Sequence, residues 1–224
     1  MSRADGQLKI AVLISGRGSN MQALTNHAGG HCTGYKICLV AANKPAEGLS
    51  LASEAGLPTT LIDHKKYNSK KEHEDALAEA IEASGASWIC LAGYMAVLSA
   101  DFIARFEGKI INIHPSLLPE YKGLHTHDCA LADKQKFHGV SVHLVTPVLD
   151  DGEVIAQIRM PVKNVDTSES LSARVLVLEH ILYPLVIGAL ASGAVTLDTG
   201  QVHWQDTSIT NTLSLPEDTT LIFG

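Results

Sequence analysis

Short apolar runs alternate with longer stretches of helical periodicity through the first half of the chain, and this feature restricts the possible folds more than any other. Such alternation is typical of βαβ units that form a parallel sheet with right-handed crossovers. The expected strands are 9–15, 36–42, 58–63, 88–93 and 109–113. Helices are expected between them, near 19–28, 48–55, 69–84 and 99–106. Ser69 and Glu72 have the spacing of a capping box and support the third helix.

The pattern changes after residue 114, where a proline-rich loop and a short helix near 127–134 precede two further apolar runs. These runs, 138–147 and 154–162, flank the sequence LDDGE and predict an antiparallel hairpin. A long helix capped within 166–170 is expected next, followed by a small hairpin over 194–205 and a loose tail. The whole pattern predicts an α/β fold: an open, mostly parallel, Rossmann-like sheet with helices on both faces and an antiparallel hairpin after the fifth strand.

Composition indicates a globular protein and disfavours one that binds nucleic acid. Of the 224 residues, 46% are hydrophobic, which is enough apolar material for a sizeable core. The formal net charge is −7, and no cluster of lysine and arginine offers a basic face to backbone phosphates. We therefore expect no nucleic-acid partner.

Cysteine usage and the lengths of the apolar runs favour a cytoplasmic location. None of the four cysteines has C-x-x-C spacing; they are Cys32, Cys38, Cys90 and Cys129. Residues 1–16 contain only a short apolar run, so no targeting segment is expected. The longest run, 181–195, is interrupted by Pro184 and falls short of the roughly 20 residues of a membrane span, so it predicts a buried helix and no membrane contact.

The sequence SGRGSN (15–20) lies between the first expected strand and the first expected helix. Glycines at this position let backbone amides approach a ligand, and a helix N-terminus favours an anion such as phosphate. The alternative is a tight turn capped by Ser19 or Asn20. A dinucleotide fingerprint is disfavoured because Met21 occupies the third glycine position and no acidic residue ends the second strand. No Gly-Lys-Ser/Thr follows either, so the loop predicts a site for a phosphomonoester.

Asn112 and His114 are two residues apart at the end of the fifth expected strand. Their side chains should therefore lie on one face, at the sheet edge where α/β proteins bind ligands. An amide donor beside an imidazole suits acyl transfer, because the amide stabilises an oxyanion while the imidazole handles a proton. The alternative is a turn asparagine and a histidine that is satisfied in the core.

A carboxylate of the LDDGE turn, Asp150 or Asp151, is a candidate third member of this site. A carboxylate that folds back over the sheet edge would orient the imidazole and raise its pKa. The alternative is that Asp-Asp-Gly supplies only turn geometry, and both roles are compatible.

Five segments together carry a resemblance to a known family. They are SGRGSNMQA from residue 15, LAGYM at 91–95, INIHPSLLPEYKGLHTH at 111–127, SVHLVTPVLDDG at 141–152 and EHILYPLV at 179–186. In order and spacing, from about residue 8 to about 187, they resemble the phosphoribosylglycinamide formyltransferases. That family is folate-dependent and acts in purine synthesis.

The resemblance implies a reaction and a set of catalytic residues. Formyl would pass from the co-substrate 10-formyltetrahydrofolate to the amine of glycinamide ribonucleotide, without a metal. Asn112, His114 and Asp150 match the family's catalytic residues. Residues matching the ribonucleotide site are Gly16, Arg17, Gly18, Ser19, Asn20 and Glu179.

The resemblance also implies a folate site in which this chain departs from its relatives. The matching residues are Lys70, Tyr94, Met95, Val97, Leu98, Asn112 and Asp150. Relatives commonly carry arginine where this chain has Ala96, and Lys70 replaces a second arginine. Because lysine lacks the bidentate fork of arginine, we expect the glutamate tail of the folate to be held less firmly.

By the same resemblance, residues 1–224 form one formyltransferase domain. The phosphate-binding half would span about 8–108, the catalytic and folate-binding half about 109–195, and a terminal hairpin and tail 195–224. A monomer or a homodimer that binds small-molecule substrates is expected.

Three other functions compete with this interpretation. A formyltetrahydrofolate hydrolase shares the Asn, His and Asp but normally has an additional N-terminal domain, and only about eight residues precede the first expected strand. A methionyl-tRNA formyltransferase would be longer and carry a basic surface. A non-catalytic module that binds nucleotide phosphates would explain SGRGSN alone and leave Asn112, His114 and Asp150 without a role.

A metal site formed by His125, His127 and His143 is a further alternative. No cysteine or carboxylate spacing supports it. We expect these histidines instead to fix the loop over the ribonucleotide pocket.

Overall fold

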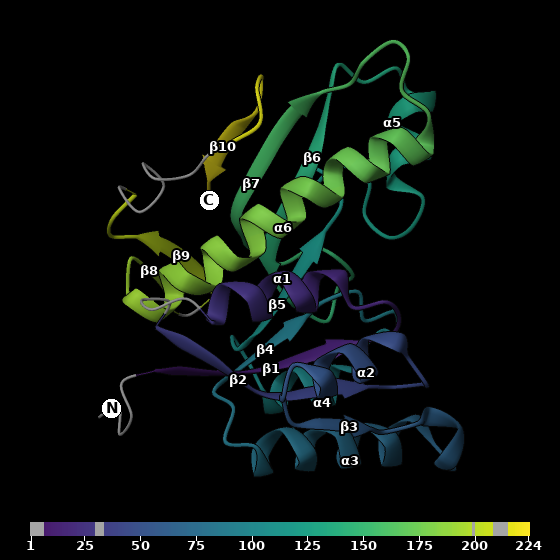
Figure 1. Ribbon diagram of the computed structural model, residues 1–224, viewed down its shortest axis with the longest axis vertical. Helices are drawn as coiled ribbons and strands as arrows, with labels where there is room; N and C mark the ends of the chain where they lie inside the picture. Colours follow the sequence, from purple (N-terminus) through teal and green to yellow (C-terminus); the bar gives the residue numbers. More distant parts are fainter. Residues whose placement is uncertain (1–6, 30–33, 199, 208–214) are drawn as a thin grey trace. The chain divides into compact units, whose positions relative to one another are not determined.

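The computed structural model describes residues 7–29, 34–198, 200–207 and 215–224 (Figure 1). The chain forms two compact units, Met1–Ile111 and Asn112–Gly224. Strand β5 (Ile110–His114) crosses this boundary, so its first residues belong to the first unit and its last three to the second. Assignment of the whole chain to one domain remains a prediction. Cys32 lies outside the described residues.

The first unit alternates strands and helices as the apolar runs predict. Its elements are β1 (Leu8–Ile14), α1 (Ser19–Ala28), β2 (Tyr35–Ala42), α2 (Glu47–Glu54), β3 (Thr59–Leu61), the 3-10 turn η1 (His64–Lys66), α3 (Lys70–Ala83), β4 (Trp88–Leu91) and α4 (Ala100–Arg105). The strand order is β4-β1-β2-β3, and all three neighbouring pairs are parallel. Right-handed crossovers then place α1 and α2 on one face and α3 and α4 on the other, which agrees with the packing of α1 on α2 and of α3 on α4.

The centre of this sheet is buried on both faces, which explains its continuous apolar sequence. Residues 10–14 of β1 have no solvent-exposed surface. A parallel strand covered by helices on both sides reads as an apolar run rather than as an alternation. The loops that follow β1 and β4 carry the candidate binding residues of this unit.

The capping box expected at α3 is only half formed. The Ser69 side chain accepts a hydrogen bond from the backbone N–H of Glu72, at 3.1 Å. The Glu72 carboxylate accepts instead from the backbone and side-chain nitrogens of Asn68, at 3.0 and 3.2 Å. The expectation of a reciprocal bond to Ser69 was therefore wrong, because Asn68 offers two donors to the same carboxylate.

The second unit begins with the end of β5 and is mostly antiparallel. Its other elements are α5 (Thr126–Ala132), β6 (Phe137–Leu144), β7 (Val154–Pro161), α6 (Ser168–Ser192), β8 (Val195–Asp198), β9 (Gln201–Trp204) and β10 (Thr220–Phe223). The strand order is β10-β7-β6-β5. The antiparallel pairing of β6 with β7 confirms the expected hairpin, and β8 with β9 confirms the small terminal one. The expected α/β fold is thus confirmed.

Helix α6 packs along β6 and β7 (Figure 1). Thr167 caps it within a capping box formed with Ser170, inside the expected range 166–170. The helix is long and apolar enough to cross a membrane by length and composition alone, but residues 182–191 are all buried. The expectation of a buried helix around Pro184 is confirmed.

The expectation of a loose tail was wrong for residues 220–223. These residues form β10, which pairs antiparallel with the outer edge of β7. Pairing between strands so far apart in sequence leaves no local signal, since TLIF alone does not identify its partner. Residues 208–214 of the expected tail lie outside the described residues.

Candidate active site

Strand β5 ends in the two polar residues that its period of two places on one face. Asn112 is half-buried and His114 is buried, with 5% of its surface exposed. Both belong to the second unit, as do Tyr121, His143 and Asp150, which lie against them.

Asp150 reaches this pair from the loop between β6 and β7. Its backbone is left-handed (φ 48°), a conformation that aspartate tolerates better than most residues, and its side chain is only 8% exposed. One carboxylate oxygen accepts a hydrogen bond from the backbone N–H of Gly123 at 2.9 Å and lies 3.5 Å from Nδ1 of His114. The other oxygen lies 3.6 Å from Nε2 of His143. The turn therefore presents a buried carboxylate to two imidazoles.

Both ring nitrogens of His114 face acceptors. Nε2 donates to the carbonyl oxygen of Tyr121 at 2.8 Å, and Nδ1 faces Asp150. A neutral imidazole has one N–H and satisfies only one of these acceptors, whereas the doubly protonated ring satisfies both. The arrangement thus presents an acceptor to each ring nitrogen of His114.

His143 holds the amide of Asn112, a role that the sequence analysis missed. Its Nδ1 donates to the carbonyl oxygen of Leu144 at 2.7 Å, which leaves Nε2 to accept from Nδ2 of Asn112 at 3.1 Å. Burial lowers the pKa of His143, which keeps the ring neutral and able to accept. One amide N–H of Asn112 is fixed in this way, and the amide has a second for a substrate.

The loop 115–123, which contacts both His114 and Asp150, is fixed by hydrogen bonds to side chains of β6 and β7. Ser141, fully buried, donates to the carbonyl oxygen of Ser116 at 2.6 Å and accepts from the N–H of Leu118 at 3.0 Å. The side chain of Gln157 donates to Ser141 at 2.8 Å and to the carbonyl oxygen of Leu118 at 2.9 Å. These bonds fix the backbone groups that position the two candidate catalytic side chains.

In the first unit, the glycine loop after β1 is shaped by a close backbone contact. Gly18 is the left-handed N-cap of α1 (φ 78°), and within the described residues no side chain caps this helix. A Cβ built on Gly18 would lie 2.9 Å from Cα of Gly48, whose N–H donates to the carbonyl oxygen of Gly16 at 3.1 Å. The alternative of a cap by Ser19 or Asn20 is therefore wrong, and the loop ends at a helix N-terminus, whose dipole favours an anion.

The loop after β4 is tied to the end of β1 through Ser15. The Ser15 hydroxyl accepts from the N–H of Met95 at 2.9 Å and donates to Asn43 at 2.8 Å. Of the apolar residues in this loop, Met95 and Val97 are 69% and 62% exposed, whereas Leu98 is buried. The loop thus offers two apolar side chains beside the glycine loop.

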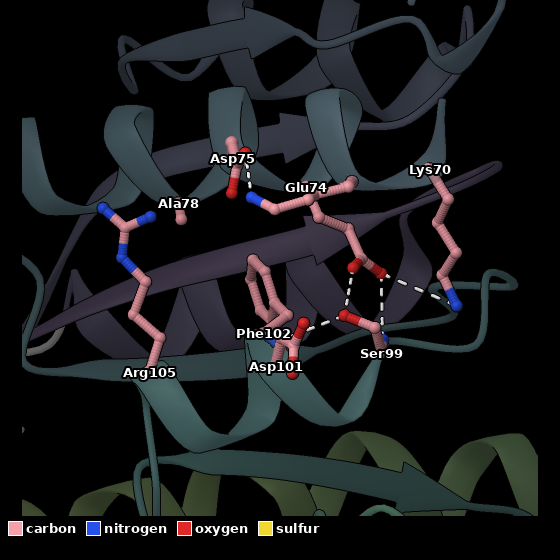
Figure 2. Close-up of a pocket in the computed structure, with 9 residues that line it drawn as sticks. Lys70, Glu74, Asp75, Ala78, Ser99, Asp101, Phe102 and Arg105 are labelled. Carbon is pink, nitrogen blue, oxygen red and sulfur yellow. Dashed lines mark hydrogen bonds and ion pairs between the residues drawn. The ribbon is translucent and has the colours of Figure 1, made fainter. Parts of the chain in front are cut away.

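Lys70 lies at a cavity of about 270 Å³ between α3 and α4 (Figure 2). Its ammonium group is 3.7 Å from Glu74, a buried carboxylate that also accepts from the backbone and hydroxyl of Ser99. Burial raises the pKa of the half-buried Tyr94, and the negative charge of Glu74 raises it further. The positive charge of Lys70 is partly balanced by Glu74 on the same helix.

Comparison with known proteins identifies the family of this chain. A family described as formyl transferase matches residues 8–187. The trifunctional purine biosynthetic protein adenosine-3 of Gallus gallus is 43% identical over 89% of this chain, which covers 20% of that protein. The phosphoribosylglycinamide formyltransferase of Escherichia coli K12 is 41% identical over 83% of this chain and 88% of its own length. The chain belongs to the phosphoribosylglycinamide formyltransferase family.

A solved structure of the family has the same fold. Glycinamide ribonucleotide transformylase 1 of Symbiobacterium toebii superposes with a TM-score of 0.86 and 36% identity, covering 90% of this chain and 96% of its own. The chain spans only about a fifth of the length of its trifunctional relatives.

The roles of individual residues in this chain remain predictions, but the positions of the residues are known. The structure brings together Asn112, His114 and Asp150 in the second unit, and Glu179 lies half-buried on α6 of the same unit. The candidate phosphate and folate residues 16–20, 70 and 94–98 lie in the first unit.

Asp150 and Asp151, which the sequence left as alternatives, are separated clearly. Asp151 is half exposed and pairs with Lys122, whereas Asp150 is buried against His114.

The three histidines considered as a metal site each contact a different partner. His125 lies 3.6 Å from Asp128, His127 bonds His138, and His143 bonds Asn112.

His143 had a signal in the sequence, whereas the backbone contacts of Tyr121 and Gly123 had none. Ser141 and His143 lie two residues apart in the second half of β6, between apolar neighbours, and buried polar side chains at such spacing indicate a site on one face. A backbone carbonyl or N–H carries no mark of its function in the sequence.

Gly16 offers a cleaner test of a phosphate site than Gly18. A Cβ at Gly16 meets no atom of the described residues within 4 Å, so Gly16→Val should fold normally and raise the KM for the ribonucleotide by about tenfold or more. Gly18→Val should instead lower the melting temperature, because its side chain meets Gly48. Thermal unfolding and steady-state kinetics of both variants check this. A normal KM in Gly16→Val would count against the loop as a phosphate site.

Proposed function

We propose that this chain transfers the formyl group of 10-formyltetrahydrofolate to the amine of glycinamide ribonucleotide in purine biosynthesis. The observation that carries the proposal is the buried contact between Asp150 and His114 beside Asn112, which suits acyl transfer. Membership of the family and the names of its relatives supply the substrates.

In this mechanism the amine nitrogen attacks the formyl carbon, and the developing oxyanion receives an N–H from Asn112. His114, protonated beside Asp150, stabilises the same negative charge. The new C–N bond forms as the bond from formyl carbon to folate N10 breaks. The proton that leaves the amine is carried to N10 by water next to Asp150, so charge and atoms balance.

Binding of the two substrates is assigned to the positions that match the family's substrate-binding residues. The loop of Gly16, Arg17, Gly18, Ser19 and Asn20 holds the ribonucleotide phosphate, and Glu179 contacts the same substrate. The folate lies against Tyr94, Met95, Val97 and Leu98, with Lys70 near its glutamate and Asn112 and Asp150 at its reacting end. The reaction needs no metal and no nucleic acid, and the enzyme works in the cytoplasm as a monomer or homodimer.

Ala96→Arg should strengthen binding of the folate tail. The residue is half-buried in the loop after β4, and Lys70 is already paired with Glu74. A new guanidinium should lower the folate KM by about fivefold, which corresponds to about 1 kcal/mol, with little change in turnover. Ala96→Gln is the control for side-chain length, and the gain should vanish with a folate that lacks glutamate. An unchanged KM would show that this position does not face the tail.

The dependence of the reaction on the amine tests the proposal against a hydrolase. Consumption of 10-formyltetrahydrofolate should require glycinamide ribonucleotide and saturate with its concentration. Equal consumption with and without the ribonucleotide would mean that water attacks the formyl carbon and would favour hydrolysis.

A further inference from the structure

The segment after residue 187, beyond the part of the chain that matches the family, contacts the strand that follows the Asp150 turn. The indole N–H of Trp204 donates to the carbonyl oxygen of Ile155 at 2.9 Å. The backbone N–H of Gly224 donates to the same oxygen at 3.0 Å. Two elements of this segment therefore hold one residue at the start of β7.

These two elements also contact each other. The ring of Phe223 on β10 packs edge-to-face against Trp204 on β9, with 4.6 Å between ring centroids. Phe223 is paired with Ala156 in the antiparallel ladder between β10 and β7. Residues 201–204 and 220–224 thus form one contact surface, which we call the C-terminal clamp.

On its other side, the same stretch of chain is held by β6. The N–H of Leu144 donates to the carbonyl oxygen of Glu153 at 2.9 Å. A Cβ built on Gly152 would lie 1.8 Å from the carbonyl oxygen of Leu144, so the two backbones touch. Residues 152–155 therefore run between β6 and the clamp.

Asp150 precedes these contacts along the chain. The aspartate sits only a few residues before Ile155, in a strained left-handed conformation. A cavity of about 290 Å³ beside the turn is lined by Lys122, Asp150, Asp151 and Gly224 of the clamp, among other residues. With open space on that side, the turn has room to move if the clamp is lost.

We propose that the C-terminal clamp is a positioning element for Asp150, so that turnover depends on residues outside the family's matched region. The inference rests on the proposed function, because it assigns to Asp150 a place in that reaction. A shift of about 1 Å in a catalytic group costs up to about a hundredfold in rate. Loss of the clamp should therefore lower kcat while the ribonucleotide KM, which we assign to the glycine loop and Glu179, stays nearly constant.

Two proline substitutions in β10 give a matched pair. Hydrogen-bonded pairs alternate along an antiparallel ladder, and Gly224 donates to Ile155, so the N–H of Ile222 points to β7 and that of Leu221 points away. Ile222→Pro removes a ladder bond, whereas Leu221→Pro keeps the ladder on an edge strand. Trp204→Phe removes the indole N–H and retains a ring for Phe223.

The full-length variants are compared in kcat, in both KM values and in hydrogen exchange of residues 145–153. Ile222→Pro should lower kcat about tenfold, leave the ribonucleotide KM within about twofold and speed exchange of the Asp150 turn. Trp204→Phe should change the same quantities in the same direction by less, and Leu221→Pro should resemble the wild type.

Unchanged kcat and unchanged exchange in Ile222→Pro and Trp204→Phe would overturn the clamp, as would faster exchange spread evenly over the second unit. If Ile222→Pro fails to fold, Trp204→Phe decides alone. Exchange of the turn is measured without substrates. Absence of formyl transfer in the wild type would therefore overturn the proposed function and leave the clamp to be judged by exchange.

Discussion

Asp150→Asn should lower the turnover of formyl transfer by about a hundredfold or more, the usual scale for losing an acid–base group. Asparagine keeps the shape of the side chain and tolerates the left-handed backbone at this position. It removes the negative charge that faces Nδ1 of His114 at 3.5 Å. The imidazole then loses the carboxylate that faces it, and steady-state kinetics should show the loss in kcat rather than in the ribonucleotide KM.

Asp151→Asn is the matched control, because the neighbouring carboxylate is half exposed and pairs with Lys122. An exposed pair of this kind contributes little, so turnover should remain within about twofold of wild type. Near-normal turnover in Asp150→Asn, or a large loss of turnover in Asp151→Asn, would contradict the assignment of the two carboxylates.

Asn112→Ala should lower kcat by about a hundredfold to a thousandfold, as removal of an oxyanion donor does in other acyl-transfer enzymes. The change also takes the amide donor from Nε2 of the buried His143. His143→Leu separates the two effects, since it keeps the amide and removes only the group that orients it. We expect this second variant to lose about tenfold in kcat.

Steady-state kinetics of both variants check the prediction. Circular dichroism checks that both variants are folded, because each substitution changes the hydrogen bonding of a buried polar group. A smaller loss in Asn112→Ala than in His143→Leu would contradict the role of the amide and shift it to the imidazole.

Elements whose sequence pattern is set by local burial could be predicted from the sequence. The apolar runs of β1 and β2 stand out because both faces of these strands are covered. Asn112 and His114 could be placed on one face by the period of a strand alone. The choice between Asp150 and Asp151 could not be made from residue spacing, because it depends on which carboxylate the turn buries, and only the family resemblance pointed to Asp150.

Features that depend on contacts between distant segments escaped prediction. β10 pairs with β7 across about sixty residues of chain, a distance over which no local propensity identifies a partner. The sequence predicts Gly18 as a phosphate-binding glycine. In the structure, the absence of a side chain at Gly18 also allows close contact with the backbone of Gly48. Tyr121 and Gly123 contribute backbone atoms, which any residue type supplies.

The fate of the formyl carbon tests the central claim most directly. The wild-type protein is incubated with 10-formyltetrahydrofolate labelled with ¹³C in the formyl group, together with glycinamide ribonucleotide, and the products are followed by NMR. If the chain transfers formyl, the label should move to the amide of the formylated ribonucleotide as tetrahydrofolate appears in equal amount. Label recovered as formate, or left on the folate, would contradict it.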